Sequence, residues 1–389
     1  NQGGKMSQIR LGMVGGGQGA FIGSVHRIAA RLDDHYKLVA GALSSNPETS
    51  KTSALELGID QERSYSSYKE MADRESTLEK GIEAVAIVTP NHLHFPIAEC
   101  FLSKGIHVIC DKPLTHTLED AKKFVKVVEN SKALFALTHN YTGYPMVRQA
   151  RELCRSGKIG KVRVIQIEYP QDWLTTPLEN ATDTPGNKQA SWRTDPSKAG
   201  AGGCIGDIGS HAFNLADFIT GAELDELCAD LSSFIPGRKN DDNAHVLLRY
   251  KNNIKGMLWS SQVAPGNENA LKIRIYGDKG GLEWEQENPN YLTLDLYGSA
   301  KQTIRRSGFG TVDIANRVSR IPPGHPEGYL EGFANLYSDF AEQINAKKEN
   351  RDPDPSSMLV PDINDGMKGI KFISTVVESS SKGGQWLKF

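Results

Sequence analysis

Short apolar runs alternate with helical patterns over the first part of the chain. Strands are predicted at residues 9–14, 37–43, 84–89, 107–109 and 134–138. Apolar positions with helical spacing lie between them, at residues 22–32, 49–57 and 95–103. Strands that alternate with helices are typical of a parallel, doubly wound α/β sheet.

The pattern changes after about residue 140. One helix is predicted at residues 146–156, and strands with alternating polarity follow at residues 162–169, 244–250, 255–262, 271–276 and 292–297. Alternation of this kind indicates a mostly antiparallel sheet with one face covered. Two further helices are predicted at residues 331–346 and 364–380. This part of the chain is therefore expected to form an α+β domain.

A glycine loop, Gly15-Gly16-Gly17-Gln18-Gly19-Ala20, joins the first strand to the first helix. Such a loop lets the backbone approach a pyrophosphate, while the N–H groups and dipole of the helix favour its negative charge. This arrangement predicts a Rossmann-type dinucleotide site beyond the carboxyl ends of the strands. Its expected contacts are Gly15, Gly17, Gly19, Ala20, Phe21, Ser44, Ser45, Thr89, Pro90, Asn91, His94, Asp111 and Lys112. For Asn91, capping of a helix is an equally good explanation.

The second strand ends at Ser44-Ser45-Asn46. A site for NAD usually has Asp or Glu at this position, which binds the ribose 2′-hydroxyl. Its absence makes NADP admissible, but no arginine stands beside these serines to bind a 2′-phosphate. NAD and NADP therefore both stay open as cofactors.

Length and composition narrow the class of protein. A chain of 389 residues is longer than a single hydrophobic core usually organises. We therefore expect two domains, a dinucleotide-binding domain at residues 6–139 and an α+β domain at residues 140–389. Met6 is expected to be the natural start. With 45 Lys+Arg against 47 Asp+Glu, no strong field favours nucleic acid or acidic membranes. No apolar run spans a bilayer, residues 1–8 lack a secretory leader, and the five cysteines form no CxxC pair. We expect a cytoplasmic protein with a small-molecule partner.

Three side chains suggest proton and charge chemistry. Asp207 and His211 are four positions apart, so on a helix they share one face. Lys112 follows a strand of the first domain and is positioned to reach the same point. Each pattern alone is common, because an Asp-x-x-x-His pair is usually a surface pair and a Lys-Pro pair a turn. No metal is expected, since a third and a fourth ligand at suitable spacing are not evident.

Several motifs together resemble one enzyme family. They are Thr89-Pro90-Asn91-His92-Leu93-His94, Cys110-Asp111-Lys112-Pro113, Trp192-Arg193-Thr194-Asp195-Pro196, the block from Gly202-Gly203 to Asp207-Ile208-Gly209-Ser210-His211, Asp241-Asp242-Asn243, Tyr276-Gly277-Asp278 to Trp284, and Gly324-His325-Pro326-Glu327-Gly328. In this order they resemble the Gfo/Idh/MocA oxidoreductases over nearly the whole chain. Two features depart from the family: Asp111 replaces the Glu of its E-K-P motif, and the glycine loop is longer, with Gly23-Ser24-Val25-His26 in place of G-x-x-H.

The resemblance implies an NAD(P)-dependent oxidoreductase that transfers hydride between nicotinamide and a secondary hydroxyl or carbonyl of a sugar, sugar derivative or inositol. It also implies that Lys112, Asp207 and His211 are catalytic. A histidine suits proton exchange with the hydroxyl, a lysine stabilises alkoxide charge, and Asp207 is expected to orient the hydroxyl or the imidazole. Trp192 and Arg193 are expected either to bind the polyol or to pack between the domains.

The resemblance further implies that the second domain binds substrate and forms a homodimer or homotetramer through its open sheet. The polar loop at residues 175–189 is expected near the substrate. Two other functions share this fold: a non-catalytic protein that senses NAD(P) or a sugar, and a glycoside hydrolase that uses NAD. The joint presence of Lys112, Asp207 and His211 favours the dehydrogenase over the sensor.

Overall fold

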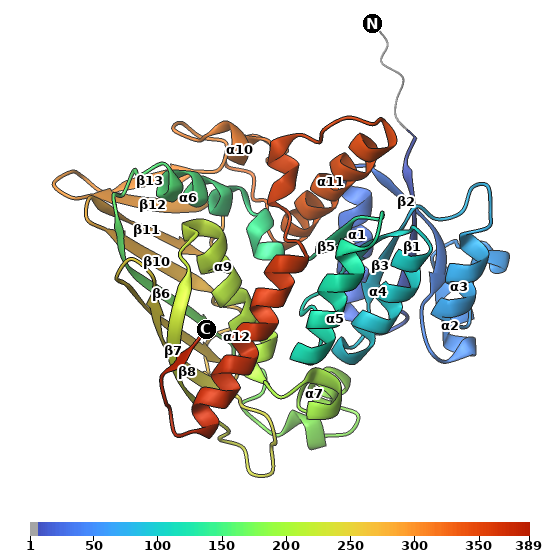
Figure 1. Cartoon of the computed structure of the whole chain (residues 1–389), viewed down its shortest axis with the longest axis horizontal. Helices are drawn as coiled ribbons and strands as arrows, with labels where there is room; N and C mark the ends of the chain where they lie inside the picture. The colour runs from blue at the N-terminus through green and yellow to red at the C-terminus, as the bar shows by residue number, and fades with distance from the viewer. Residues whose placement is uncertain (1–6) are drawn as a thin grey trace, which may run out of the picture. The chain divides into compact units, whose positions relative to one another are not determined.

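A computed structural model describes residues 7–389, so the expected start at Met6 lies outside the described residues. The chain forms two compact units (Figure 1). The first unit contains residues 7–115, Glu119–Gly143 and Tyr329–Gly366. The second contains His116–Leu118, Tyr144–Gly328 and Met367–Phe389. The expected boundary after residue 139 lies close to the observed one at Gly143, but the chain returns to the first unit at Tyr329.

The sheet of the first unit is five-stranded, fully parallel and ordered β2-β1-β3-β4-β5. Its strands are β1 (Ile9–Gly15), β2 (Tyr36–Ala42), β3 (Ala84–Val88), β4 (His107–Cys110) and β5 (Phe135–Leu137). The central strand β3 is buried throughout, as expected for a sheet covered on both faces. The predicted Rossmann-type fold is confirmed, and because the strands are parallel, their carboxyl ends share one edge.

The helices of this unit are α1 (Phe21–Leu32), α2 (Pro47–Glu56), α3 (Tyr68–Glu75), α4 (His94–Ser103), α5 (Leu118–Glu129) and α11 (Tyr329–Lys348). Helix α1 packs against α11, and the buried side chains of Val25, Phe333 and Phe340 join the core beside β1. Phe124 of α5 contacts Phe95 and Phe135 by its ring. Figure 1 shows α4 and α5 in front of the sheet.

The sheet of the second unit has nine strands, ordered β13-β12-β11-β10-β6-β9-β8-β7-β14. All neighbours pair antiparallel except β6 and β9. The strands are β6 (Val162–Pro170), β7 (Leu224–Ser232), β8 (Asn243–Tyr250), β9 (Ile254–Ser261), β10 (Lys272–Gly277), β11 (Gly280–Glu285), β12 (Tyr291–Leu296), β13 (Gln302–Arg305) and β14 (Leu387–Lys388). This mostly antiparallel sheet confirms the predicted architecture of the second domain.

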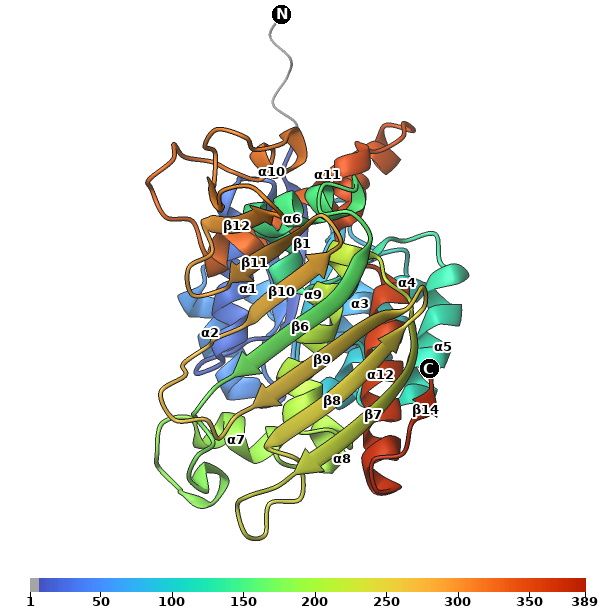
Figure 2. The same ribbon diagram turned by 90° about the vertical axis from the view of Figure 1, so that its left-hand side faces the viewer.

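Helices cover one face of this sheet (Figure 2). They are α6 (Pro145–Arg155), α9 (Ser210–Thr220) and α12 (Ile363–Ser381), with the shorter α7 (Asn187–Arg193), α8 (Pro196–Ala199) and α10 (Asp313–Asn316) in the connections. Phe213 of α9 stacks on Phe372 of α12, with 4.4 Å between ring centroids. In β8, buried Val246 alternates with Leu247, whose side chain is exposed, so the other face of the sheet is open.

The sequence analysis did not predict α3, α5, α7, α8, α10, β7, β11, β13 or β14. Strand β7, for example, has only three buried positions among nine, so its alternation is weak. Within residues 7–389, no helix combines the length and the apolar character that crossing a bilayer requires.

Candidate functional site

The glycine loop lies between β1 and α1 and has a backbone that only glycine adopts readily. Gly15, Gly16 and Gly19 have φ angles of 83°, 74° and 77°. The N–H of Gly17 donates to the carbonyl of Leu43 at 2.9 Å. A Cβ at Gly17 would lie 2.7 Å from that same oxygen, so a side chain is excluded there. The backbone of the loop therefore packs directly against the end of β2.

A cleft opens in front of this loop, lined by residues 16–21 together with side chains of α1 and α2. At Gly19 a Cβ would meet no atom within 4 Å, so the backbone faces open space. The first turn of α1 has no acidic side chain, and no side chain caps its N–H groups. These features fit the pyrophosphate of a dinucleotide. The buried Oγ1 of Thr89, which has no hydrogen-bond partner within residues 7–389, offers a further polar contact.

The loop is held from two sides. Arg27 of α1 donates to the carbonyl of Gly16 at 2.6 Å. Ser53 of α2 accepts from the N–H of Gln18 at 3.1 Å. At the end of β2, Ser44 accepts from the N–H of Asn46, whose own side chain caps α2. This leaves the exposed Ser45 as the more accessible of the two serines expected to contact the cofactor.

The segment after β3 contains two residues with roles expected from sequence. The cap positions of the turn Asn91–Leu93 and of α4 are Pro90 and Leu93, so Asn91 does not occupy the cap position considered from sequence. His94 is fully buried, and its ring nitrogens lie 2.7 Å from the carbonyl of Pro113 and 2.9 Å from that of Thr89. Burial lowers the pKa of His94. His94 thus ties together the loops that follow β3 and β4. The contact with the cofactor that the sequence predicts for His94 stays a prediction.

Asp111 is anchored by a buried histidine. Its Oδ1 lies 3.1 Å from Nε2 of His26 and accepts from Thr138 at 3.0 Å. The other ring nitrogen of His26 lies 2.6 Å from the hydroxyl of Tyr337. Burial opposes ionisation of Asp111, but the hydrogen bond and charge of His26 and the charge of Lys112 outweigh it and lower its pKa. The Asp found in place of the family's Glu therefore stays a fixed anion beside Lys112.

His139 also lies in the electrostatic environment of Lys112. Burial, together with the charge of Lys112, lowers the pKa of His139 to about 3. The imidazole of His139 is therefore neutral at physiological pH and adds no positive charge near Lys112.

In the second unit, Asp207 lies in a π-helical turn, Ile205–Gly209, and His211 in the first turn of α9. The sequence predicted an ordinary helix for both residues. The carboxylate of Asp241 accepts from the N–H groups of Gly203 and Ile205 at 2.6 and 2.9 Å, which fixes the start of the turn. A Cβ at Gly203 would lie 2.3 Å from the Asp241 carbonyl, so glycine is needed for this close approach. Single π-helical turns are frequent at functional sites.

Both carboxylate oxygens of Asp207 are held by donors. Gln262 donates to Oδ2 at 2.8 Å, and Nε of Arg193 lies 3.3 Å from Oδ1. Arg193 was expected from sequence to bind substrate or pack between domains, and the structure makes it a partner of Asp207. Gln262 was not singled out from sequence. Its one signal is its place as the polar last residue of a predicted strand.

Aromatic rings surround Arg193 and His211. The guanidinium of Arg193 lies 4.4 Å from the ring centroid of Trp192 and 5.9 Å from that of Trp173. The ring of His211, a buried residue, lies 6.2 Å from that of Tyr169. Trp173 and Tyr169 were not singled out from sequence. Indole faces beside a fixed carboxylate suit a polyhydroxyl compound, which offers C–H surfaces to rings and hydroxyls to charged groups.

Among the residues that the structure describes, no group of three or more His, Cys, Asp or Glu side chains is arranged to hold a metal ion.

Family models of known proteins match parts of both units. Residues 9–152 match the model of an oxidoreductase family with an NAD-binding Rossmann fold, and residues 147–283 match that of the GFO/IDH/MocA C-terminal domain. The crystal structure of an oxidoreductase from Sinorhizobium meliloti is 57% identical, with a TM-score of 0.89 over 98% of this chain and 100% of that one.

Two relatives have more specific descriptions. One is the crystal structure of an inositol dehydrogenase homologue from Azotobacter vinelandii complexed with NADH and myo-inositol, 31% identical, with a TM-score of 0.90 and 98% of each chain covered. The other is the levoglucosan dehydrogenase of Pseudarthrobacter phenanthrenivorans, 28% identical over 83% of each chain. Fold, motifs and these matches agree, and the chain belongs to the Gfo/Idh/MocA family of oxidoreductases.

Proposed function

We propose that this protein is an NAD(P)-dependent dehydrogenase that acts on a CH–OH group of a cyclic polyol, a sugar or a sugar derivative. The observation that carries the proposal is Asp207, a carboxylate fixed by Gln262 and Arg193 in a π-helical turn just before His211. The same chain has a glycine loop whose geometry fits a pyrophosphate. Family membership and the polyol and sugar-derived compounds named for the two relatives support this class of substrate.

In the proposed reaction, a bound nicotinamide supplies the hydride acceptor. His211 takes the hydroxyl proton as the carbon is oxidised and returns it in the reverse direction. Lys112 stabilises the negative charge that develops on the substrate oxygen. Asp207, held at both oxygens, orients the hydroxyl or the imidazole. Because Gln262 and Arg193 already bind Asp207, its carboxylate needs little reorganisation during the reaction.

The experiment is a substrate panel with purified protein. It includes myo-inositol, levoglucosan, other cyclic polyols and aldoses, each tested with NAD and with NADP by the absorbance of the reduced nicotinamide. We expect turnover with at least one polyol or sugar. Binding of NADH without turnover of any compound would favour a sensor, and hydrolysis of a nitrophenyl glycoside without added cofactor would favour a glycosidase.

We also propose that the open face of the nine-stranded sheet joins copies of this chain into a homodimer or homotetramer. On this face, Leu247 is 52% exposed and Tyr276 is 41% exposed. Large apolar side chains exposed on a broad sheet are typical of an interface. Light scattering tests the proposal, and a monomer at every concentration would contradict it.

A further inference from the structure

A buried arginine, Arg238, binds the segment of the chain that contains Arg193. We call residues 174–194 the strap. It lies between β6 and α8, before the turn of Asp207, and it includes the short turn Leu178–Asn180 and α7. Arg238 lies outside the strap, in the loop between β7 and β8, and its side chain is 1% exposed. A charge this deeply buried is costly unless it is fully paired.

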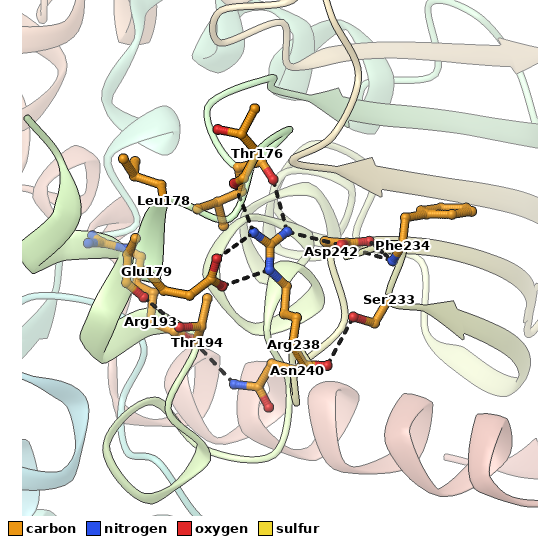
Figure 3. Close-up of polar contacts among 12 residues, drawn as sticks. Thr176, Leu178, Glu179, Arg193, Thr194, Ser233, Phe234, Arg238, Asn240 and Asp242 are labelled. Atoms are coloured by element: carbon orange, nitrogen blue, oxygen red, sulfur yellow. Dashed lines mark hydrogen bonds and ion pairs between the residues drawn. The ribbon is translucent and has the colours of Figure 1, made fainter. Parts of the chain in front are cut away.

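Arg238 uses its whole guanidinium to bind the strap (Figure 3). Its Nε and one terminal nitrogen donate to the two carboxylate oxygens of Glu179, at 2.8 and 2.9 Å. It also donates to the carbonyls of Leu174 and Thr176, at 2.9 and 3.2 Å. The bidentate pair with Glu179 fixes direction as well as distance. Burial opposes ionisation of Glu179, yet the hydrogen bonds and charge of Arg238 lower its pKa, so the pair is ionic.

The sheet holds Arg238 from the other side. Asp242, which is fully buried, accepts from Nη1 of Arg238 at 3.0 Å and also accepts the N–H of Phe234. The hydroxyl of Ser233 donates to the Arg238 carbonyl at 3.0 Å. Arg238 therefore bridges the carboxylate of Asp242, just before β8, and the carboxylate of Glu179 on the strap.

The same network leads to Asp207 by two routes. The main chain of Gln262 donates to the Asp242 carbonyl at 2.8 Å and accepts from the N–H of Leu174 at 3.0 Å, while its side chain binds Asp207. At the far end of the strap, Asn240 donates to the carbonyl of Arg193 at 3.3 Å. The loop that contains Arg238 and Asn240 thus binds the strap at two places, near its beginning and at Arg193 (Figure 3).

We propose that Arg238 is a positioning residue for polyol recognition: by clamping Glu179, it holds the strap so that Arg193 stays against Asp207. This inference rests on the proposed function and explains how the polar loop at residues 175–189 contributes to it. Arg238 touches no reacting atom in this account. Its loss should weaken substrate binding more than the chemical step, because ground state and transition state use the same strap contacts.

The test replaces Glu179 by Gln. In this variant Arg238 keeps Asp242 and the two carbonyls, so the fold is spared while the charged partner on the strap is lost. We expect KM for myo-inositol, or for the best compound of the panel, to rise about tenfold with kcat within about twofold, from the loss of one charge-assisted hydrogen-bonded pair. The affinity for NADH, followed by its fluorescence, should not change.

A second readout does not depend on turnover. Hydrogen–deuterium exchange of peptides covering residues 174–194 should accelerate in Glu179→Gln, whereas peptides of β1 and α1 should exchange as in the natural protein. The variant Arg238→Lys keeps the charge but loses the bidentate geometry, and it should act in the same direction. The matched control is Glu342→Gln in the first unit, where Glu342 forms another bidentate pair with Arg351, at 2.7 and 2.8 Å.

Faster exchange of the strap together with a higher KM supports the inference. If the strap exchanges in Glu179→Gln as it does in the natural protein, the inference is overturned. It is also overturned if the strap exchanges faster but KM is unchanged, or if only kcat falls. Equal effects in Glu342→Gln also overturn it, because they would show a general response to losing an ion pair. If the natural protein turns over no compound of the panel, the proposed function is wrong. The hydrogen–deuterium exchange result would still show whether the ion pair of Glu179 and Arg238 holds the strap.

Discussion

The side chain of Gln262 donates a hydrogen bond of 2.8 Å to the carboxylate of Asp207. Gln262 is 2% exposed, so its side-chain amide is shielded from water. Its main chain also joins Leu174 of the strap to Asp242, the residue before β8. One residue thus connects the orientation of Asp207 to the framework of the second unit.

Replacing Gln262 by Leu should therefore reduce catalysis. A hydrogen bond to a charged group contributes about 1.5–3 kcal/mol, and its loss corresponds to a fall of about tenfold to a hundredfold in kcat/KM. Affinity for NADH should be retained, because the glycine loop belongs to the other unit. Steady-state kinetics and NADH fluorescence measure the two effects. The control is Gln149→Leu, which removes a buried glutamine of the same unit that bonds Gly310 and Val312; it should change stability only. A normal kcat/KM in Gln262→Leu would show that Asp207 does not need this donor.

Gly17→Ala should weaken binding of the dinucleotide. The new Cβ would lie 2.7 Å from the Leu43 carbonyl, so the loop must move away from β2. We expect the Kd for NADH to rise by about tenfold or more, since the pyrophosphate depends on close approach of this backbone. The control Gly105→Ala introduces a side chain at a positive φ of 75° with no atom nearby, in the loop before β4. It should cost about 1 kcal/mol of stability and leave the Kd unchanged. Equal Kd values in both variants would argue against the assigned role of the loop.

The free energy of unfolding should fall on mild acidification, in part because His107 binds a proton more weakly in the folded state than in the unfolded state. Burial and the charge of Lys347 lower the pKa of His107 to about 4, and its Nδ1 accepts from the N–H of Leu134 at 2.9 Å. Because the folded pKa lies below the unfolded value of about 6.5, the stability that neutral His107 contributes is fully present above pH 6.5 and is lost toward pH 4. The change between pH 6.5 and 4.5 should be about 2 kcal/mol.

Urea unfolding of the natural protein and of His107→Asn at several pH values measures this contribution. The Asn side chain offers an acceptor but does not titrate. The natural protein should lose its advantage over the variant as pH falls through this window. A difference that stays constant from pH 7.5 to 4.5 would contradict the assignment.

Much of the framework could be predicted from sequence, because periodicity and glycine position are local properties. The loop at Gly15–Gly19 and the strands that position Asp111 and Lys112 are examples. Contacts between distant segments could not be predicted. The pairing of Glu179 with Arg238, the donor Gln262 and the return of Tyr329–Gly366 to the first unit depend on tertiary packing. The π-helical turn of Asp207 was missed because it depends on Asp241, a residue far along the chain whose carboxylate fixes the turn.

The direct test of the central claim is the rate of hydride transfer in His211→Ala, with NADH affinity measured on the same sample. Loss of a proton-transfer group should lower kcat by about 10²–10⁴-fold on the best substrate of the panel. Lys112→Ala should lose a comparable factor, because it removes stabilisation of the developing alkoxide. NADH should bind His211→Ala as it binds the natural protein. A near-normal kcat in His211→Ala would contradict the account, because the proton would then have another acceptor.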